Sequence, residues 1–196
     1  MKIILHQQDI TIGDLTTPGN ILKGLSKKNS SEKTIHLFPE IFLGGYPLQD
    51  LVLDKGFITS YQESLNDLDQ SFKTSTESNQ VFIFGGPSYE LNEKGLPVKI
   101  FNTAYLAEPS KGIKDIYHKK LLPNYDIFDE QKYFTPGTKN SFLKIFGKTF
   151  AIIICEDMWH STQHQVDPVS EIHQQVISDK ISLDGIFNIS ASPFAI

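Results

Sequence analysis

A buried strand that ends in a cysteine is the feature that most constrains this chain. Residues 150–154 form an unbroken apolar run, and the single cysteine, Cys155, follows it directly, with Glu156 and Asp157 next in the sequence. A continuous apolar run of this length is typical of a strand buried on both faces. The switch to polar residues predicts that the strand leaves the core at Cys155, where an α/β protein can present a nucleophile. A cysteine that only packs as a small hydrophobe is the alternative that this pattern leaves open.

Short apolar segments alternate with helical segments along the rest of the chain. The clearest helix spans residues 58–72, where apolar residues recur at steps of three and four. Two further helices are expected, from about Pro18 to Lys28 and over residues 168–180. Strands are expected at residues 3–5, 34–38, 81–84, 100–106, 113–117, 142–146, 149–154 and 185–189.

Turn residues separate these strands and create hairpins. The Gly-Gly-Pro at residues 85–87 is expected to close the third strand, and turns are expected at residues 92–95, 109–112 and 147–148. Because hairpins interrupt the alternation of helices and strands, the order predicts a layered α/β fold with one mixed sheet or two sheets. The length of 196 residues predicts a single domain over residues 1–196.

Composition and charge exclude several classes of function. A hydrophobic content of 39% and a charged content of 21% are ordinary for a soluble globular protein. The net charge of −5 argues against a nucleic-acid partner, because a phosphate backbone requires a basic face. The apolar run at the N-terminus is too short for a signal peptide, and no run approaches the roughly 20 residues of a membrane span. With only one cysteine, these features predict a cytoplasmic protein with no membrane contact.

Three groups elsewhere in the chain could serve a nucleophilic Cys155. Glu40 follows the second expected strand, and a carboxylate at that end of a sheet could act as a general base. Lys119 and Lys120 follow the expected strand at residues 113–117, and a lysine beside a thiol would favour the thiolate and stabilise an oxyanion. Glu130 lies in an aromatic and polar loop. Taken singly, the sequence favours a solvated surface charge for each of these residues, or a capping role after the strand for Glu40.

These residues occur in segments that together match a known pattern. The segments are Phe-Pro-Glu at residues 38–40, Tyr-His-Lys-Lys-Leu-Leu-Pro at 117–123 and Cys-Glu-Asp-Met-Trp at 155–159. In them the sequence resembles the carbon–nitrogen hydrolase (nitrilase) superfamily, in which a Glu, a Lys and a Cys form the catalytic set in that chain order. The resemblance implies that Glu40, Lys119 and Cys155 are catalytic, whereas Lys120 falls at a variable position.

Four further segments resemble one branch of the superfamily. They are Gly45-Tyr46, the ten residues 121–130, Tyr-Phe-Thr-Pro-Gly at 133–137, and residues 188–194. These segments resemble the N-terminal glutaminase domain of glutamine-dependent NAD synthetases, and the match runs from about Ile3 to Phe194. The resemblance implies a four-layer α-β-β-α sandwich of the nitrilase type. Because further strands normally follow in that fold, the chain is expected to be truncated at its C-terminus.

The same resemblance assigns residues to a substrate pocket. It implies that the glutamine pocket is lined by Tyr46, Tyr125, Phe128, Glu156 and Ser190. Glu130 would be the family's second glutamate, which supports the lysine and the substrate amide. Glu156 also has a direct physical reason, because a carboxylate next to the nucleophile could receive the amino group of the substrate. For Tyr46 and Phe128, ordinary packing is the alternative.

The function implied is hydrolysis of the glutamine side-chain amide through a cysteine thioester. In the resembled enzymes the ammonia passes to an NAD synthetase domain, in the same longer chain or as a separate partner, and that domain alone would use ATP and Mg. The glutaminase reaction itself would need no cofactor or metal, and a homo-oligomer is expected. The alternatives are another carbon–nitrogen hydrolase, such as an ω-amidase or a carbamoyl hydrolase, and an inactive fragment of such an enzyme.

The other motifs give weaker evidence of function. His160 and His164 stand at a spacing that metal ligands use on a helix, but no accompanying Glu or second cluster supports a metal site. No Gly-x-Ser-x-Gly motif is present, which disfavours a serine α/β-hydrolase. A papain-like pair of Cys155 with a histidine, for which His118 is the best candidate, lacks the residues that usually surround such a cysteine.

Overall fold

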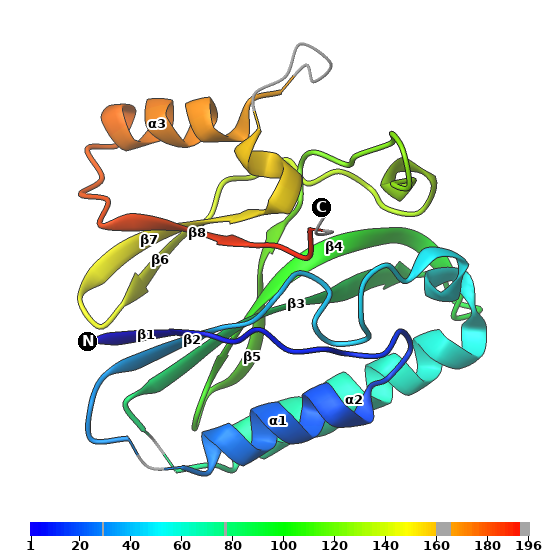
Figure 1. The fold of residues 1–196 in the computed structure, drawn as a ribbon, viewed down its shortest axis with the longest axis horizontal. Coiled ribbons are helices and arrows are strands. Elements are labelled where there is room, and N and C mark those ends of the chain that lie inside the picture. The colour runs from blue at the N-terminus through cyan, green and yellow to red at the C-terminus, as the bar shows by residue number, and fades with distance from the viewer. Residues whose placement is uncertain (29, 77, 160–165, 193–196) are drawn as a thin grey trace.

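The computed structural model describes residues 1–28, 30–76, 78–159 and 166–192 (Figure 1). The strands are β1 (Lys2–Leu5), β2 (Thr34–Leu37), β3 (Gln80–Leu91), β4 (Pro97–Glu108), β5 (Gly112–His118), β6 (Phe142–Ile145), β7 (Lys148–Ile154) and β8 (Gly185–Ile189). The α-helices are α1 (Thr16–Ser26), α2 (Lys55–Lys73) and α3 (Pro168–Ser178). Short 3₁₀ turns occupy η1 (Gln49–Leu53), η2 (Glu130–Lys132) and η3 (Cys155–Met158).

The strands form two separate sheets. One has the order β1-β2-β3-β4-β5, with parallel pairing from β1 to β3 and antiparallel pairing from β3 to β5. The other has the order β6-β7-β8, in which β6 and β7 are antiparallel and β7 and β8 are parallel. The parallel pairs are joined through α1, α2 and α3, as parallel strands require, and the antiparallel pairs through hairpins. The sequence had left open one mixed sheet or two, and the structure has two.

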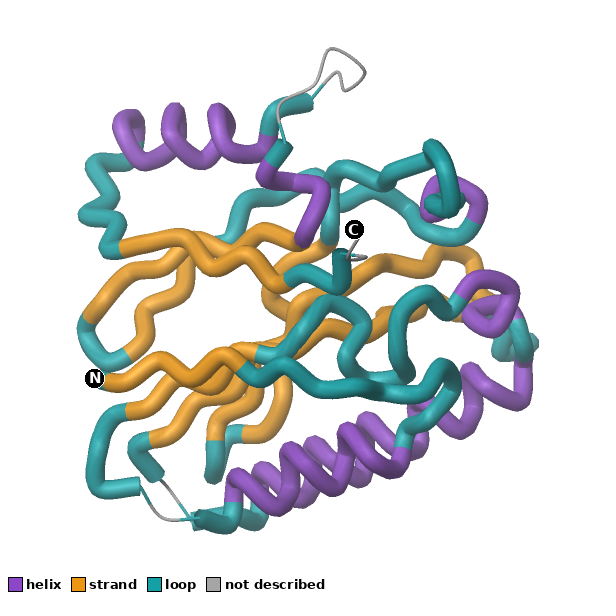
Figure 2. The backbone as a smooth tube through the Cα atoms, in the orientation of Figure 1, coloured by secondary structure: helices purple, strands orange, loops and turns teal. Residues whose placement is uncertain are grey.

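The two sheets pack face to face, and helices cover their outer faces (Figures 1 and 2). The side chains of Ile35, Ile83 and Ile152 belong to the apolar cluster between the sheets. The helices α1 and α2 lie on the outer face of the five-stranded sheet, and α3 lies on that of the three-stranded sheet. The result is a helix layer, two sheet layers and a second helix layer.

The apolar run before Cys155 is buried on both faces, as its composition predicts. Residues Phe150, Ile152 and Ile154 face the other sheet, whereas Ala151 and Ile153 pack with α3. Successive strand residues point to opposite faces, so a strand between a sheet and a helix layer must be apolar at every position. This burial fixes the position at which the chain leaves the core.

The three expected helices are confirmed, and local sequence explains where two of them begin. The side chain of Asp54 accepts a hydrogen bond of 2.7 Å from the backbone N–H of Phe57 and caps α2. Asp167 caps α3 in the same way, with Pro168 in the first turn. The apolar stripe of α2 includes Tyr61, which is buried against the five-stranded sheet.

Two local predictions were wrong. The segment at residues 85–87 does not close the third strand, because β3 continues through it to Leu91 and pairs with β4 along its length. The hairpin between β6 and β7 turns at residues 146–147, one residue earlier than expected. Among the described residues, no helix is long and apolar enough to cross a membrane.

Candidate active site

Cys155 lies where the chain leaves β7 and enters η3. Its φ angle is 45°, in the left-handed region that side chains other than glycine rarely adopt. The Sγ atom lies 3.4 Å from Oγ of Ser192, and the side chain is partly exposed. The side-chain amide of Asn188 on β8 donates a hydrogen bond of 3.4 Å to the backbone carbonyl of Cys155. The thiol is thus presented on a strained turn. The sequence predicts that the strand ends at this position but does not predict the strain.

Glu40 follows β2 and is almost fully buried, with 1% of its side chain exposed. Its Oε1 accepts two hydrogen bonds of 2.7 Å, from Nδ2 of Asn102 and from Nζ of Lys119. Its Oε2 accepts a bond of 3.2 Å from the backbone N–H of Ala191, which follows β8. The two oxygens therefore have different surroundings, and among the described residues only Oε1 receives two donors.

Lys119 follows β5 and bridges two glutamates. Its Nζ donates to Oε1 of Glu40 at 2.7 Å and to Oε1 of Glu130 at 2.8 Å, and the lysine side chain is 1% exposed. The hydroxyl of Tyr46 donates to the same Glu130 oxygen at 3.0 Å. Burial by itself would lower the pKa of Lys119, but the two carboxylates raise it above its usual value, so the ammonium stays charged. Burial raises the pKa of Glu130, and Lys119 opposes that shift.

The thiol is close enough to Glu40 and Lys119 for both charges to act on it. Burial, and after it the negative charge of Glu40, raise the pKa of Cys155 to about 11. The charge of Lys119 and the bond to Ser192 lower it and only partly compensate. The resting cysteine is therefore a neutral thiol at pH 7, and it needs a base before it can attack.

The residues that the resemblance assigned to a pocket gather beside this cluster. Tyr125 donates a hydrogen bond of 2.8 Å to Oε2 of Glu156 and makes an edge contact with Phe128, with 5.5 Å between ring centroids. The ring of Tyr46 is also near Phe128, with ring centroids 6.5 Å apart. Burial and the neighbouring Glu156 raise the pKa of Tyr125 to about 12. The structure thus brings Tyr46, Tyr125, Phe128 and Glu156 together at the site.

Ser190 also lies at this end of the sheets, but the next two residues make the hydrogen bonds to the cluster. The backbone of Ala191 bonds Glu40, and the hydroxyl of Ser192 lies against the thiol. Two residues after β8, Ala191 and Ser192, thus contribute to the cluster. The structure places Ser190 in that segment without a hydrogen bond from its hydroxyl to the described cluster residues.

Asp157 fixes the cysteine turn to the lysine segment, a role that the sequence did not indicate. The carboxylate is completely buried. Its Oδ1 accepts hydrogen bonds from the backbone N–H groups of Lys120 and Leu121, at 3.0 and 2.8 Å. Its Oδ2 accepts from the backbone of Ile154 at 3.1 Å and from the hydroxyl of Tyr117 at 2.8 Å. One side chain therefore bonds both the residue before Cys155 and the residue after Lys119.

Lys120 is not a solvated charge, which corrects one of the alternatives for the lysine pair. Its side chain is 3% exposed, and Nζ donates to Oε2 of Glu171 at 2.5 Å and to Oδ1 of Asn140 at 2.7 Å. The side chain of Lys120 therefore anchors the segment after β5 to α3, whereas Lys119 turns to the glutamates.

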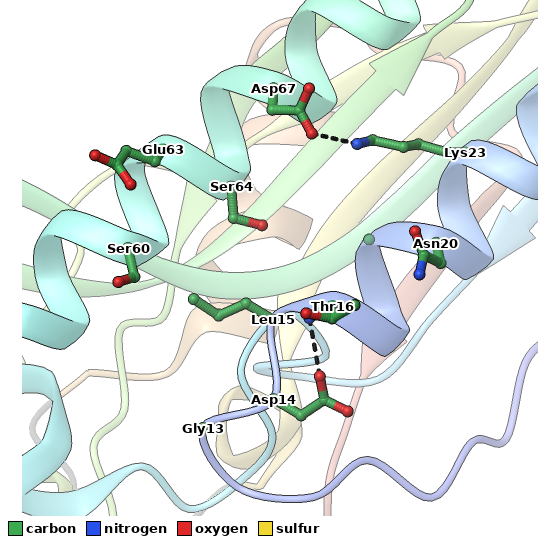
Figure 3. Close-up of a pocket in the computed structure, with 11 residues that line it drawn as sticks. Gly13, Asp14, Leu15, Thr16, Asn20, Lys23, Ser60, Glu63, Ser64 and Asp67 are labelled. Carbon is green, nitrogen blue, oxygen red and sulfur yellow. Dashed lines mark hydrogen bonds and ion pairs between the residues drawn. The ribbon is translucent and has the colours of Figure 1, made fainter.

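The remaining candidates do not join the cluster. His118 bonds Oδ2 of Asp115 at 2.7 Å and stacks on Phe101, so the structure gives it other partners than Cys155. His160 and His164 lie outside the described residues, and the described residues contain no group of His, Cys, Asp and Glu that could hold a metal ion. A polar surface pocket between α1 and α2 is lined by none of the cluster residues (Figure 3).

Four residues of the cluster escaped sequence reasoning, and they are Asn102, Asp157, Ala191 and Ser192. A signal was present for Asn102, because it is a polar residue within an otherwise apolar expected strand. Such a residue, when buried, requires a hydrogen-bond partner. Ala191 acts through its backbone, so its side chain carries no signal.

The fold and the site define a mixed α/β protein with a cysteine, a lysine and two glutamates at the shared end of two packed sheets. Residues 26–164 match the carbon-nitrogen hydrolase family model. The chain therefore belongs to the carbon–nitrogen hydrolase family, which confirms the resemblance stated from the sequence.

The relatives that the chain matches include NAD synthetases and an amidase. A glutamine-dependent NAD(+) synthetase from Synechocystis sp. is 30% identical over 203 residues, which cover 98% of this chain and 34% of that protein. The structure of glutamine-dependent NAD+ synthetase from Acinetobacter baumannii in complex with ADP matches with a TM-score of 0.71 at 23% identity, over 94% of this chain and 31% of that one. A mutant of the Nesterenkonia AN1 amidase from the nitrilase superfamily matches with a TM-score of 0.68 at 16% identity, over 97% and 64%.

The chain matches only part of each relative, which limits what can be concluded from the similarity. The chain spans about a third of the length of the curated relatives, and it matches their N-terminal part. The two solved structures share the fold with it. The substrate and the partners of the whole relatives are therefore treated below as proposals.

Proposed function

We propose that this chain hydrolyses the side-chain amide of glutamine through a thioester on Cys155. The observation that carries the proposal is the bridge that Lys119 forms between Glu40 and Glu130, beside a thiol that needs a base. The family supplies the reaction class, cleavage of a carbon–nitrogen bond. Residues 1–196 would act as one glutamine amidohydrolase domain.

The first half of the reaction forms the thioester. Glu40 takes the proton of the Cys155 thiol, and Sγ attacks the amide carbonyl carbon. Lys119 stabilises the negative oxygen of the tetrahedral intermediate, with the backbone N–H of Glu156 as a second donor. The carbon–nitrogen bond then breaks, and Glu40 returns its proton to the departing nitrogen, which leaves as ammonia.

The second half regenerates the thiol. Glu40 takes a proton from a water molecule, whose oxygen attacks the thioester carbonyl. The carbon–sulfur bond breaks, and the proton returns through Glu40 to Sγ. Glutamine and water are thus converted into glutamate and ammonia. Glu130 keeps Lys119 in place in both halves, and no metal or cofactor takes part in these steps.

Selection of glutamine would rest on Glu156. A carboxylate adjacent to the nucleophile can receive the α-ammonium group of glutamine, and the hydroxyl of Tyr125 holds that carboxylate through a 2.8 Å hydrogen bond. Tyr46 and Phe128 would close the pocket around the aliphatic part of the substrate, and Ser190 would lie at its rim. A site that takes only short amides would have no use for this carboxylate.

The similarity to NAD synthetases supports a wider proposal for the ammonia. A synthetase domain, on a longer chain or on a separate partner, would receive it and would use ATP and Mg for its own step. We propose that the protein acts in the cytoplasm as a homo-oligomer. An ω-amidase, a carbamoyl hydrolase and an inactive fragment are the competing assignments for the site.

The experiment measures ammonia release from glutamine, from short amides and from N-carbamoyl compounds, by the chain and by Cys155→Ala. We expect release with a preference for glutamine, and we expect Cys155→Ala to abolish it. In Glu156→Gln the KM for glutamine should rise, whereas the KM for a short amide should change little. Equal activity on short amides, or unchanged release by Cys155→Ala, would overturn the proposal.

A further inference from the structure

The geometry points to Asn102 as a positioning residue for the general base. We propose that its side-chain amide holds Oε1 of Glu40, so that Oε2 is the oxygen that takes and returns the proton. This inference rests on the proposed function of the site, and it concerns a residue that makes no contact with Cys155 in the described structure. It is distinct from the roles of Lys119 and Glu130, which act on charge.

The hydrogen bonds around Glu40 separate its two oxygens. The Nδ2 group of Asn102 and the Nζ group of Lys119 both donate to Oε1 at 2.7 Å. Two donors at this distance occupy the lone pairs of one carboxylate oxygen. From the described part of the chain, Oε2 receives one longer bond of 3.2 Å, donated by the backbone of Ala191, and so retains capacity for a proton. The proton therefore moves to and from Oε2.

Asn102 also connects Glu40 with Lys119 through its backbone. Its carbonyl oxygen accepts a hydrogen bond of 2.8 Å from the backbone N–H of Lys119. The orientation of the Asn102 side chain follows from its partner, because an ionised carboxylate only accepts and must therefore face the NH₂ group. One residue on β4 thus sets the relative positions of the base and of the oxyanion stabiliser.

The side-chain amide of Asn102 is buried together with the carboxylate that it contacts. The residue is 0% exposed, and its Oδ1 has no hydrogen-bond partner among the described residues. A buried acceptor without a partner reduces stability, whereas the bond that Nδ2 donates to the carboxylate of Glu40 increases it. The bond to Glu40 is therefore the contact that accounts for an amide at this position.

The charged and titratable groups that face Glu40 are Lys119, Glu130, Tyr46 and Cys155. All four belong to the proposed reaction, whereas the Asn102 amide is neutral. A change at Asn102 therefore alters the position of Glu40 without removing any of these charges.

The test compares Asn102→Leu with the unchanged chain and with Thr103→Val as a control. Thr103 is also fully buried on β4, and its hydroxyl bonds Ser88 at 2.6 Å, away from Glu40. With whichever amide the unchanged chain hydrolyses, we expect Asn102→Leu to lower kcat by about 10- to 100-fold, with KM nearly unchanged. We expect its melting temperature to fall, because a buried carboxylate loses a donor. Thr103→Val should lower the melting temperature and leave kcat unchanged.

A second variant gives a pH signature. In Asn102→Asp, an ionised carboxyl group would repel Oε1 of Glu40, whereas a protonated one could still donate to it. The activity of Asn102→Asp relative to that of the unchanged chain should therefore fall as the pH rises. A relative activity that is independent of pH would contradict the inference.

A crystal structure of Asn102→Leu provides a readout that does not require turnover. We expect the Glu40 carboxylate to rotate and the bond between Oε2 and the N–H of Ala191 to be lost. Unchanged Glu40 geometry, or unchanged kcat, would overturn the role of Asn102 even if glutamine is the substrate. Absence of glutamine hydrolysis by the unchanged chain would overturn the proposed function, and the rotation of Glu40 would still decide the role of Asn102.

Discussion

Gly85 on β3 lies directly against the backbone of Glu40. A Cβ atom added at Gly85 would come within 2.7 Å of Cα of Glu40 and within 2.3 Å of the backbone nitrogen of Ile41. The glycine also donates a backbone hydrogen bond of 3.1 Å to Pro39 and accepts one of 2.9 Å from Leu43. The chain after β2 can therefore cross β3 at this distance only because residue 85 has no side chain.

We expect Gly85→Ala to displace Glu40 and to lower kcat/KM by about 100-fold or more, the cost of moving a catalytic group by about 1 Å. Ammonia release at several glutamine concentrations measures the effect. Gly24→Ala is the matched control, because nothing lies within 4 Å of a Cβ added at Gly24 in α1. That variant should keep its activity and gain about 0.5–1 kcal/mol of stability, as glycine is a poor helix former. Full activity of Gly85→Ala would show that the close approach does not position the base.

Gly137 permits a similar close approach to the segment that carries Lys119. A Cβ atom added there would come within 2.1 Å of the carbonyl oxygen of His118, and the backbone N–H of Gly137 donates to the carbonyl of Lys119 at 2.8 Å. The two glycines thus permit the close packing of the segments that carry Glu40 and Lys119. Both lie in segments that the sequence had classified only as turns or loops.

The fold was largely predictable from the sequence, because its elements are set by local patterns. The apolar run at residues 150–154 identified a strand buried on both faces, and the stripe of α2 identified a helix on one face of a sheet. The end of the third strand was predicted wrongly, because Gly85 was read as a turn residue. Its actual role depends on the approach of the chain near Glu40, a contact between distant segments that no local pattern contains.

The sequence identified only those site residues whose own side chains carry the chemistry. Glu40, Lys119 and Cys155 stand at strand ends and match a family pattern, and the structure places them in one cluster. Lys120 was misread as a solvated charge, because its partner, Glu171, is distant in the sequence. Ala191 contributes its backbone N–H to Glu40. The position of that group depends on the folded chain and cannot be read from the sequence.

Removing the charge of Glu40 should make the Cys155 thiol easier to alkylate, although it should slow amide hydrolysis. Burial and the charge of Glu40 together raise the pKa of Cys155 to about 11. In Glu40→Gln that charge is removed, so the pKa of the thiol should fall toward 9 while burial still keeps it raised. Alkylation of the single cysteine by iodoacetamide, measured from pH 7 to 11, gives the pKa directly.

We therefore expect Glu40→Gln to be alkylated faster than the unchanged chain at pH 9, and to lose amide hydrolysis by about 100-fold or more because the base is absent. Lys119→Met should have the opposite effect on the thiol. The charge of Lys119 lowers the pKa of Cys155, so removal of that charge should raise this pKa. A slower alkylation of Glu40→Gln at pH 9 would mean that Glu40 promotes the thiolate in the resting protein.

Tyr117 and Asp157 permit a prediction about stability. The hydroxyl of Tyr117 donates to Oδ2 of the buried Asp157 at 2.8 Å. Burial raises the pKa of Asp157, and this hydrogen bond is among the contacts that oppose the shift. A carboxyl group whose pKa is raised on folding binds protons more tightly in the folded state, so its contribution to stability decreases as the pH rises through the raised value. Loss of the Tyr117 bond would raise the pKa of Asp157 further and strengthen this dependence.

In Tyr117→Phe, we expect the free energy of unfolding to fall by about 1.5–3 kcal/mol at pH 8, where the lost bond is to a charged group, and by about 1 kcal/mol at low pH, where it is to a neutral one. Urea denaturation at pH 4 and pH 8 measures both values. Tyr105→Phe is the matched control, because the hydroxyl of Tyr105 donates to the neutral carbonyl of Pro87 at 2.8 Å. Its loss of stability should be the same at both pH values. A pH-independent loss in Tyr117→Phe would show that the bond to Asp157 does not hold the charged carboxylate between the cysteine turn and the lysine segment.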